Sequence, residues 1–202
     1  AASDVYKRQS YRYGSDTVLS HFSYTFEKGF IYGITAPSGT GKTTLLNLIG
    51  NILKPAQGEI ETDFKTGIAY VFQEPELLSQ LTIAENIALP LAAYLKKEIA
   101  FEQAISILQK MELDGFENRF PNELSFGQQQ RAAIARALTY PSPLLLMDEP
   151  FKGLDEALSR RIIKRIRERQ TENGQTILFT SHNPGELRLF ADKTVRLDPT
   201  SH

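Results

Sequence analysis

The sequence predicts an α/β fold with a mainly parallel sheet, an antiparallel β region near the N-terminus and an inserted helical subdomain. Short apolar runs such as FIYGIT at 30–35 and QTILFTSH at 175–182 are bounded by glycine or polar residues, as buried parallel strands are. These runs alternate with segments of helical periodicity, and such alternation is typical of a parallel sheet. From about 81 to 140 only the helical period occurs, which predicts the helical insert.

The local pattern predicts each element in turn. TVLSHFSYTFE approximately alternates apolar and polar residues, which indicates a half-buried strand or hairpin, whereas KTTLLNLIGNIL has helical spacing and ends at KPAQG. The opening AASDVYKRQ has no Met and lacks the alternation of a first strand, so we expect a fragment or an altered start. From the end of the sequence at DPTSH we expect that no regulatory domain follows. The predicted order is strand 17–27, strand 30–35, helix 42–53, strand 67–73, helical block 81–140, strand 143–150, helix 155–170 and strand 175–182.

Composition limits the classes of function. The 202 residues are 41% apolar and 23% charged, as in an ordinary globular protein, and the formal net charge of -1 offers no basic footprint for nucleic acid. No apolar run approaches the roughly 20 residues of a membrane helix, because IALPLAAYL is short and contains Pro90. We therefore expect a soluble chain. The absence of cysteine excludes disulfides and cysteine-ligated metals, and fits a reducing compartment.

Polar residues follow the predicted strands at the points where the apolar runs end. They are the segment 38–44, Gln73, the pair Asp148 and Glu149, and His182. Because ligands of parallel α/β sheets bind at the carboxyl ends of the strands, we expect these groups to form one site.

The loop APSGTGKTT predicts a phosphate site. Backbone N–H groups of a glycine-rich loop that opens a helix point at a phosphate, and the helix dipole adds partial positive charge. Gly39 and Gly41 let the backbone approach, Lys42 can reach the β and γ phosphates, and the Thr43 hydroxyl can bind Mg²⁺. An ordinary helix start with glycines nearby is the alternative. The pattern usually begins with Gly, and Ala36 matters only if its φ must be positive, so we expect a mild effect.

Two carboxylates end the strand LLLMDEP. Beside a Mg²⁺ site, we assign Asp148 to the metal and Glu149 to orienting and deprotonating the attacking water. An isolated Asp–Glu pair would more simply be a solvated strand end, and the phosphate loop is what favours the catalytic interpretation.

The segment LSFGQQQR at 124–131 adds a family resemblance. Together with APSGTGKTT, the glutamine of VFQEP, LLLMDEP, GLD and TSH, in that order, it resembles the nucleotide-binding subunit of an ATP-binding cassette (ABC) transporter over residues 10–197. VFQEP with LTIAENIALPL, and DEPFKGLD, are most similar to the nitrate, sulfonate and taurine importer branch.

The resemblance implies a P-loop NTPase (RecA-like) fold in a single ABC ATPase domain, 1–202. Residues 1–76 and 142–202 would form the nucleotide-binding core and 77–141 the helical signature subdomain. Two subunits would enclose two ATP molecules, with Mg²⁺ as cofactor. The predicted catalytic residues are Glu149, His182, Gln73 and Lys42, and the predicted Mg²⁺ ligands are Thr43, Gln73 and Asp148.

The resemblance also assigns the ATP contacts. Tyr13 is the expected adenine-stacking residue, with Tyr11 as second choice. The other contacts within one chain are Pro37, Ser38, Gly39, Thr40, Gly41, Lys42, Thr43 and Thr44, and those made across the dimer are Ser125, Phe126, Gly127, Gln128 and Asp155. Considered alone, His182 and Gln73 would more often be structural.

Three positions depart from the family pattern. Phe126 replaces a Gly of the signature, usually LSGGQ, and could crowd the partner's nucleotide; Ala36 replaces Gly, and Asn183 replaces Asp. The catalytic set is complete, so we predict an active ATPase.

The predicted function is the ATPase of an importer of a small solute, peripheral on the cytoplasmic face of the membrane. Its partners would be a second ABC subunit, a separate permease and, indirectly, a solute-binding protein, but no nucleic acid. Alternatives are an exporter or a lipoprotein or cell-division machine, and a nucleotide-binding regulatory module with little turnover. The helix RRIIKRIRER is read as amphipathic and solvated rather than as a nucleic-acid stripe. Some of Leu77, Leu78 and Leu81 are expected to be exposed as a docking surface.

Overall fold

The computed structural model describes residues 4–13, 16–37, 39–60 and 67–197, and the side chains of 24–37, 39–56, 60 and 67–197. Its larger sheet has five strands in the order β5-β6-β7-β3-β8, and every neighbouring pair is parallel. The predicted parallel sheet is thereby confirmed. These strands are β3 (Ile31–Thr35), β5 (Ala69–Val71), β6 (Leu144–Met147), β7 (Thr176–Thr180) and β8 (Lys193–Arg196).

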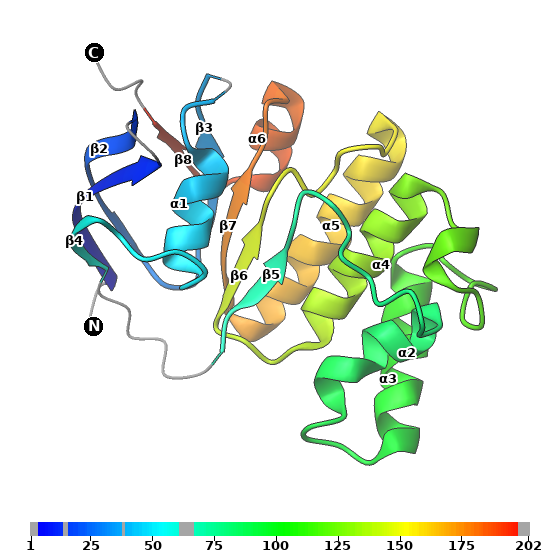
Figure 1. Ribbon diagram of the computed structural model, residues 1–202. Coiled ribbons are helices and arrows are strands. Elements are labelled where there is room, and N and C mark those ends of the chain that lie inside the picture. The colour runs from blue at the N-terminus through cyan, green and yellow to red at the C-terminus, as the bar shows by residue number, and fades with distance from the viewer. Residues whose placement is uncertain (1–3, 14–15, 38, 61–66, 198–202) are drawn as a thin grey trace.

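A smaller antiparallel sheet lies beside α1 (Lys42–Ile49), as Figure 1 shows, and confirms the predicted N-terminal β region. Its order is β2-β1-β4, with β1 (Asp4–Tyr13), β2 (Asp16–Phe26) and β4 (Gln57–Ile60). The opening segment lacks the alternation of a first strand, yet residues 4–13 form β1. Pairing with two neighbours holds β1 in the sheet, and its register shifts account for the poor alternation.

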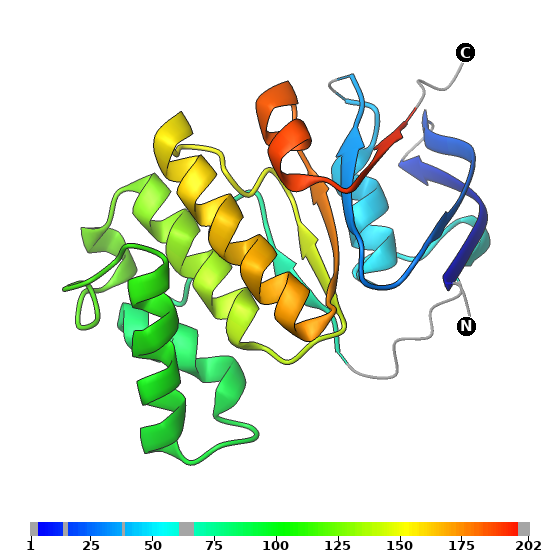
Figure 2. The same ribbon diagram turned by 180° about the vertical axis from the view of Figure 1, so that it is seen from behind.

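Helices cover both faces of the parallel sheet, with α1 on one face and α5 and α6 on the other (Figures 1 and 2). The helix α1 ends at Ile49, before the predicted end at residue 53, because Gly50 caps it and Asn51 has φ 58. The remaining helices are α2 (Ile83–Ala88), α3 (Lys97–Lys110), α4 (Phe126–Thr139), α5 (Glu156–Asn173), α6 (Pro184–Phe190) and the 3₁₀ helices η1 (Leu89–Leu91) and η2 (Pro121–Glu123).

Each face of the sheet has its own apolar cluster, because successive strand residues point to opposite sides. Tyr32, Ile34 and Leu146 pack with the apolar side of α1. Ile31 and Phe179 belong to the other cluster, which also takes in residues of α2, α3, α4 and α5. One continuous core therefore joins the predicted helical insert to the sheet.

The helices of the insert pack on one another, since α2 contacts both α3 and α4 and α3 contacts α4. They lie together on one side of the molecule (Figure 1). In α5 the predicted inward face is correct: Ile162, Ile163 and Ile166 are buried, whereas Arg160 and Lys164 are exposed. Within the described part of the chain, no helix has the length and apolar character needed to cross a membrane.

Candidate functional site

A cavity of about 530 Å³ opens where the sequence places its polar strand ends. The loop at the start of α1 and the segments that follow β5, β6 and β7 all contribute side chains to it. The lining residues are Gly39, Gly41, Lys42, Thr43, Thr44, Gln73, Asp148, Glu149, Lys152 and His182.

The loop before α1 has the backbone that the glycine pattern predicts. Gly39 and Gly41 have φ values of 79° and 86°, and glycine adopts this left-handed conformation without strain. Thr40 closes the loop, because its N–H and its hydroxyl both donate to the Pro37 carbonyl, at 3.3 and 2.7 Å. Ala36 is buried and is not among the residues with positive φ, so its methyl group causes no backbone strain.

Two predicted contacts cannot be placed. Ser38 lies outside the described residues. Tyr13 ends β1 and Tyr11 lies within it, but the side chains of both lie outside the described part.

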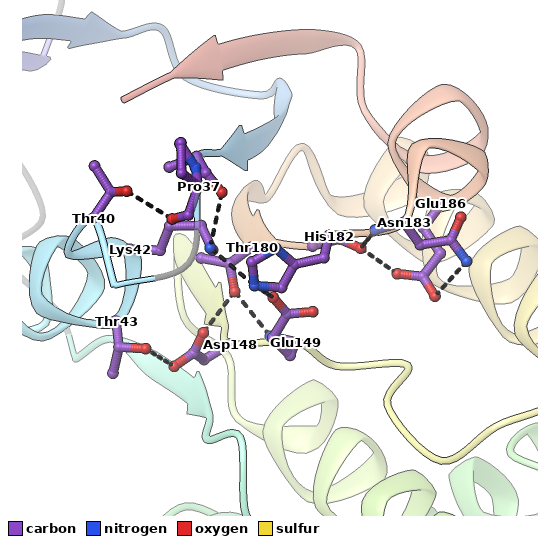
Figure 3. Close-up of polar contacts among 12 residues, drawn as sticks. Pro37, Thr40, Lys42, Thr43, Asp148, Glu149, Thr180, His182, Asn183 and Glu186 are labelled. Atoms are coloured by element: carbon purple, nitrogen blue, oxygen red, sulfur yellow. Dashed lines mark hydrogen bonds and ion pairs between the residues drawn. The ribbon is translucent and has the colours of Figure 1, made fainter. Parts of the chain in front are cut away.

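Lys42 is a buried lysine that lines the cavity. Its Nζ donates to the Ala36 carbonyl at 3.3 Å and lies 3.0 Å from His182 Nε2 (Figure 3). Since an ammonium group can only donate, His182 Nε2 acts as the acceptor, and the proton of a neutral ring is then on Nδ1. The site thus brings Lys42 and His182 into contact.

Asp148 is held from both sides by hydroxyl groups. Thr43 Oγ1 donates to Asp148 Oδ2 and Thr180 Oγ1 donates to Asp148 Oδ1, each at 2.6 Å (Figure 3). The Asp148 N–H donates to the Val71 carbonyl of the neighbouring strand at 2.8 Å. Asp148 as a residue is 2% exposed, and these donors fix the orientation of its carboxylate beside Thr43.

Glu149 has a strained backbone and a carboxylate oxygen that accepts no hydrogen bond from the described residues. Its φ of 47° is in the left-handed region, which non-glycine residues rarely adopt. Its N–H donates to Thr180 Oγ1 at 2.9 Å. Its Oε1 is buried, receives no hydrogen bond from the described residues and lies 3.3 Å from His182 Nε2. A carboxylate oxygen with a free lone pair in a cavity can accept a proton from a water molecule.

Sequence reasoning missed Thr180, which bonds both acidic residues. It is the fifth residue of β7 and is fully buried. The only sequence signal is its position two residues before His182, where an apolar strand meets the polar edge.

The loop that carries His182 is held by Glu186. Ser181 Oγ donates to Glu186 Oε2 at 2.5 Å, and the Asn183 side chain accepts from the Gly185 N–H and so caps α6. Burial raises the pKa of the Glu186 carboxyl, and the negative charge of Glu149 raises it further, whereas the Ser181 and Asn183 hydrogen bonds lower it. Asn183, which departs from the family pattern, is therefore an effective helix cap.

The signature residues lie outside the cavity lining. Ser125 is the N-cap of α4 and forms a capping box with Gln128. A Cβ on Gly127 would lie 2.6 Å from the Gly153 carbonyl oxygen, so the two segments are in close contact. Asp155 is exposed and caps α5 through the Leu158 N–H at 2.9 Å.

Comparisons with known proteins agree with this geometry. A model of the ABC transporter family matches residues 19–152. The thiamine import ATP-binding proteins ThiQ of Shigella flexneri serotype 5b (strain 8401) and of Escherichia coli O157:H7 are each 38% identical over 184 residues, which is 86% of this chain and 79% of the relative. These relatives do not confirm the predicted nitrate, sulfonate and taurine branch.

Solved structures with the same fold are also similar in sequence. The dimeric post-hydrolysis state of the ATP-binding cassette MJ0796 bound to ADP and Pi matches with a TM-score of 0.87 at 32% identity, over 98% of this chain and 94% of that one. The dimeric structure of MJ0796, a bacterial ABC transporter cassette, matches with a TM-score of 0.86 at 32% identity, over 97% and 94%. Motifs, fold and relatives agree that the chain belongs to the ABC transporter family, as an ATP-binding cassette with ATPase activity.

Proposed function

We propose that the chain powers the import of a small solute through a separate permease, as a peripheral subunit on the cytoplasmic face of the membrane. Support comes from the relatives named for thiamine import and from the dimeric form of the solved relatives. The working unit is a dimer in the ATP state, and in each chain residues 77–141 form the helical unit and the rest the core.

The cavity residues divide the binding of ATP among them. The backbone of residues 39–44 surrounds the phosphates and Lys42 neutralises their charge. Thr43 and Asp148 would hold Mg²⁺, assisted by Gln73, because their oxygens are the ligands that this ion prefers. Among the described residues no group of three or more His, Cys, Asp or Glu side chains is arranged to hold a metal ion by itself. Bound Mg²⁺ would neutralise phosphate charge.

Hydrolysis depends on Glu149, and the observation that carries this proposal is its buried Oε1 in the cavity, which accepts no hydrogen bond from any described residue. Glu149 accepts the proton of the attacking water, and its strained backbone is held by Thr180. His182, between Lys42 and Glu149, contacts the terminal phosphate. Thus one side of the site holds the phosphates and the other activates water.

The second half of each ATP site comes from the partner subunit. Ser125, Phe126, Gly127 and Gln128 open α4, where N–H groups and the helix dipole favour an anion. Asp155 crosses the interface from the start of α5. This arrangement explains why these residues do not line the cavity of their own chain.

The segment after Gln73 offers a docking surface to the permease. Leu78 is exposed, as the sequence predicts for some of its leucines, whereas Leu77 and Leu81 are partly buried. Asn86 fixes the segment, because its Oδ1 accepts from the Leu78 N–H and its Nδ2 donates to the Leu78, Leu81 and Thr82 carbonyls.

Uptake in vesicles tests the transport role and the solute. The chain is reconstituted with its candidate permease and binding protein, and ATP-dependent accumulation of thiamine, nitrate, taurine and an alkyl sulfonate is measured. Import of one solute, lost in the Glu149→Gln variant, is the expected result. ATP-driven efflux, or ATPase activity that no permease stimulates, would contradict the importer assignment.

A further inference from the structure

We propose that Lys152 binds the terminal phosphate of ATP and distinguishes ATP from ADP, and that Phe126 and Glu74 hold it in position before ATP binds. The inference rests on the proposed nucleotide site around Lys42.

Lys152 belongs to the cavity, although it is far from the phosphate loop in sequence. It lies in the turn that follows the two carboxylates, and its N–H donates to the Glu149 carbonyl at 3.1 Å. Its side chain lines the same cavity as Lys42 and is about half exposed. Lys42 is buried and already bonds Ala36 and His182, so the cavity lining has one buried, fixed lysine and one half-exposed lysine.

Two other segments hold the Lys152 ammonium group. It lies 5.6 Å from the centre of the Phe126 ring, within the range of a cation–π contact. It also lies 3.5 Å from Glu74 Oε1, and Glu74 directly follows Gln73. The ammonium group therefore joins the start of the signature helix, the segment after β5 and the turn after β6.

The bulky residue of the signature takes part in this arrangement. Gly153 has φ 80°, and a Cβ on it would lie 2.7 Å from Phe126 Cδ1, so the ring packs directly over the glycine. Phe126 therefore lies against the turn of its own chain, where it can hold Lys152, instead of projecting away from it.

The ion pair between Lys152 and Glu74 is weak enough for the Lys152 ammonium group to leave Glu74 and bind a phosphate instead. Both side chains are largely exposed, at 47% and 64%, and such pairs contribute about 0 to 1 kcal/mol. A terminal phosphate carries more negative charge than one carboxylate and binds beside Lys42, so the ammonium group gains by moving from Glu74 to the phosphate. ADP lacks that phosphate and leaves the pair with Glu74 intact.

The test compares two nucleotides on the whole chain. Dissociation constants of the Mg²⁺ complexes of AMP-PNP, a non-hydrolysable triphosphate, and of ADP are measured by isothermal titration calorimetry. Lys152→Gln is expected to weaken AMP-PNP binding about 5-fold, the factor for a charge pair of about 1 kcal/mol, and to leave ADP binding unchanged. Lys152→Arg keeps the charge and should keep the preference for AMP-PNP. Glu74→Gln frees the ammonium group and should tighten AMP-PNP binding alone.

Two controls separate the possible failures. Lys164→Gln removes an exposed lysine of α5 that lies outside the cavity lining, and it should change neither constant. Lys42→Ala should weaken the binding of both AMP-PNP and ADP. If it weakens the binding of neither, the proposed site itself is wrong. A second outcome is that Lys42→Ala weakens the binding of both nucleotides, while Lys152→Gln changes neither dissociation constant or changes both by the same factor. In that case only the role of Lys152 is overturned.

Discussion

At the scale of single residues, the site consists of reactive groups whose positions are set by less conspicuous neighbours. Asp148 and Glu149 carry the proposed chemistry, yet Thr180 donates to one and accepts from the other. Glu149 adopts a φ of 47°, and strain of this kind persists only where surrounding contacts maintain it. The hydroxyl of Thr180 is therefore expected to matter for stability and for turnover.

The variant Thr180→Val tests the role of the hydroxyl, because valine has nearly the same shape as threonine but cannot form these hydrogen bonds. It leaves the buried Asp148 Oδ1 and the Glu149 N–H without the partner they have now, which should lower the free energy of unfolding by about 2 to 4 kcal/mol. Misplacement of Glu149 should lower kcat by about 10- to 100-fold. Urea unfolding and an ATPase assay measure the two effects. Thr180→Ser keeps the hydroxyl and should retain most of the activity, whereas wild-type kcat in Thr180→Val would show that the hydroxyl does not position Glu149.

At the scale of elements, the starts of α4 and α5 are fixed by caps and by close contact with the turn after β6. Ser125 and Asp155 satisfy free N–H groups of the two helices. Between them, Gly153 packs under the Phe126 ring. The start of α4 thus lies against this turn in a contact that only glycine allows.

Gly153→Ala should therefore destabilise the chain in two separable ways. The left-handed φ costs alanine about 1 to 2 kcal/mol, and contact of its Cβ with the Phe126 ring adds to this. Chemical denaturation of Gly153→Ala, Phe126→Ala and the double variant measures both parts. The double variant should recover the contact part but not the backbone part, and strictly additive effects would refute packing of Phe126 on Gly153.

The contact between Glu112 and Arg161 of α5 predicts that the stability of the fold depends on pH. Glu112, just after α3, accepts from Arg161 Nε and Nη2 of α5 at 2.8 and 2.9 Å, and this bond is the main cause that lowers its pKa below the ordinary 4.5. A lowered pKa stabilises the fold fully above the ordinary value, and that contribution is lost as the pH falls through the folded-state value.

The comparison is between wild type and Glu112→Gln, by urea unfolding from pH 3.5 to 7. Because the pair is partly exposed, the free energy of unfolding of wild type should exceed that of the variant by only about 0.5 to 1 kcal/mol at pH 7. This difference should shrink below pH 4.5 and in high salt. A difference that grows on acidification would contradict the ion pair.

At the scale of the whole molecule, the sequence predicts the parts whose signal is local and repeated. The apolar strands, the glycine loop and the polar strand ends predict the sheet and the residues of the cavity. The strand β1 was missed because it is set by pairing with β2 and β4 and not by its own pattern. The short β4, α6 and β8 likewise depend on tertiary contacts. Thr180 and Lys152 were missed because their roles come from neighbours distant in sequence.

The central claim is that two chains enclose ATP and that Glu149 hydrolyses it, and gel filtration of Glu149→Gln with MgATP, with MgADP and without nucleotide tests it most directly. Removing the carboxylate should trap bound ATP, so the account predicts a monomer without nucleotide and with ADP, and a dimer with ATP alone. Lys42→Ala added to this variant should abolish the shift. If Glu149→Gln binds ATP yet remains a monomer, or hydrolyses ATP at the wild-type rate, the account is contradicted.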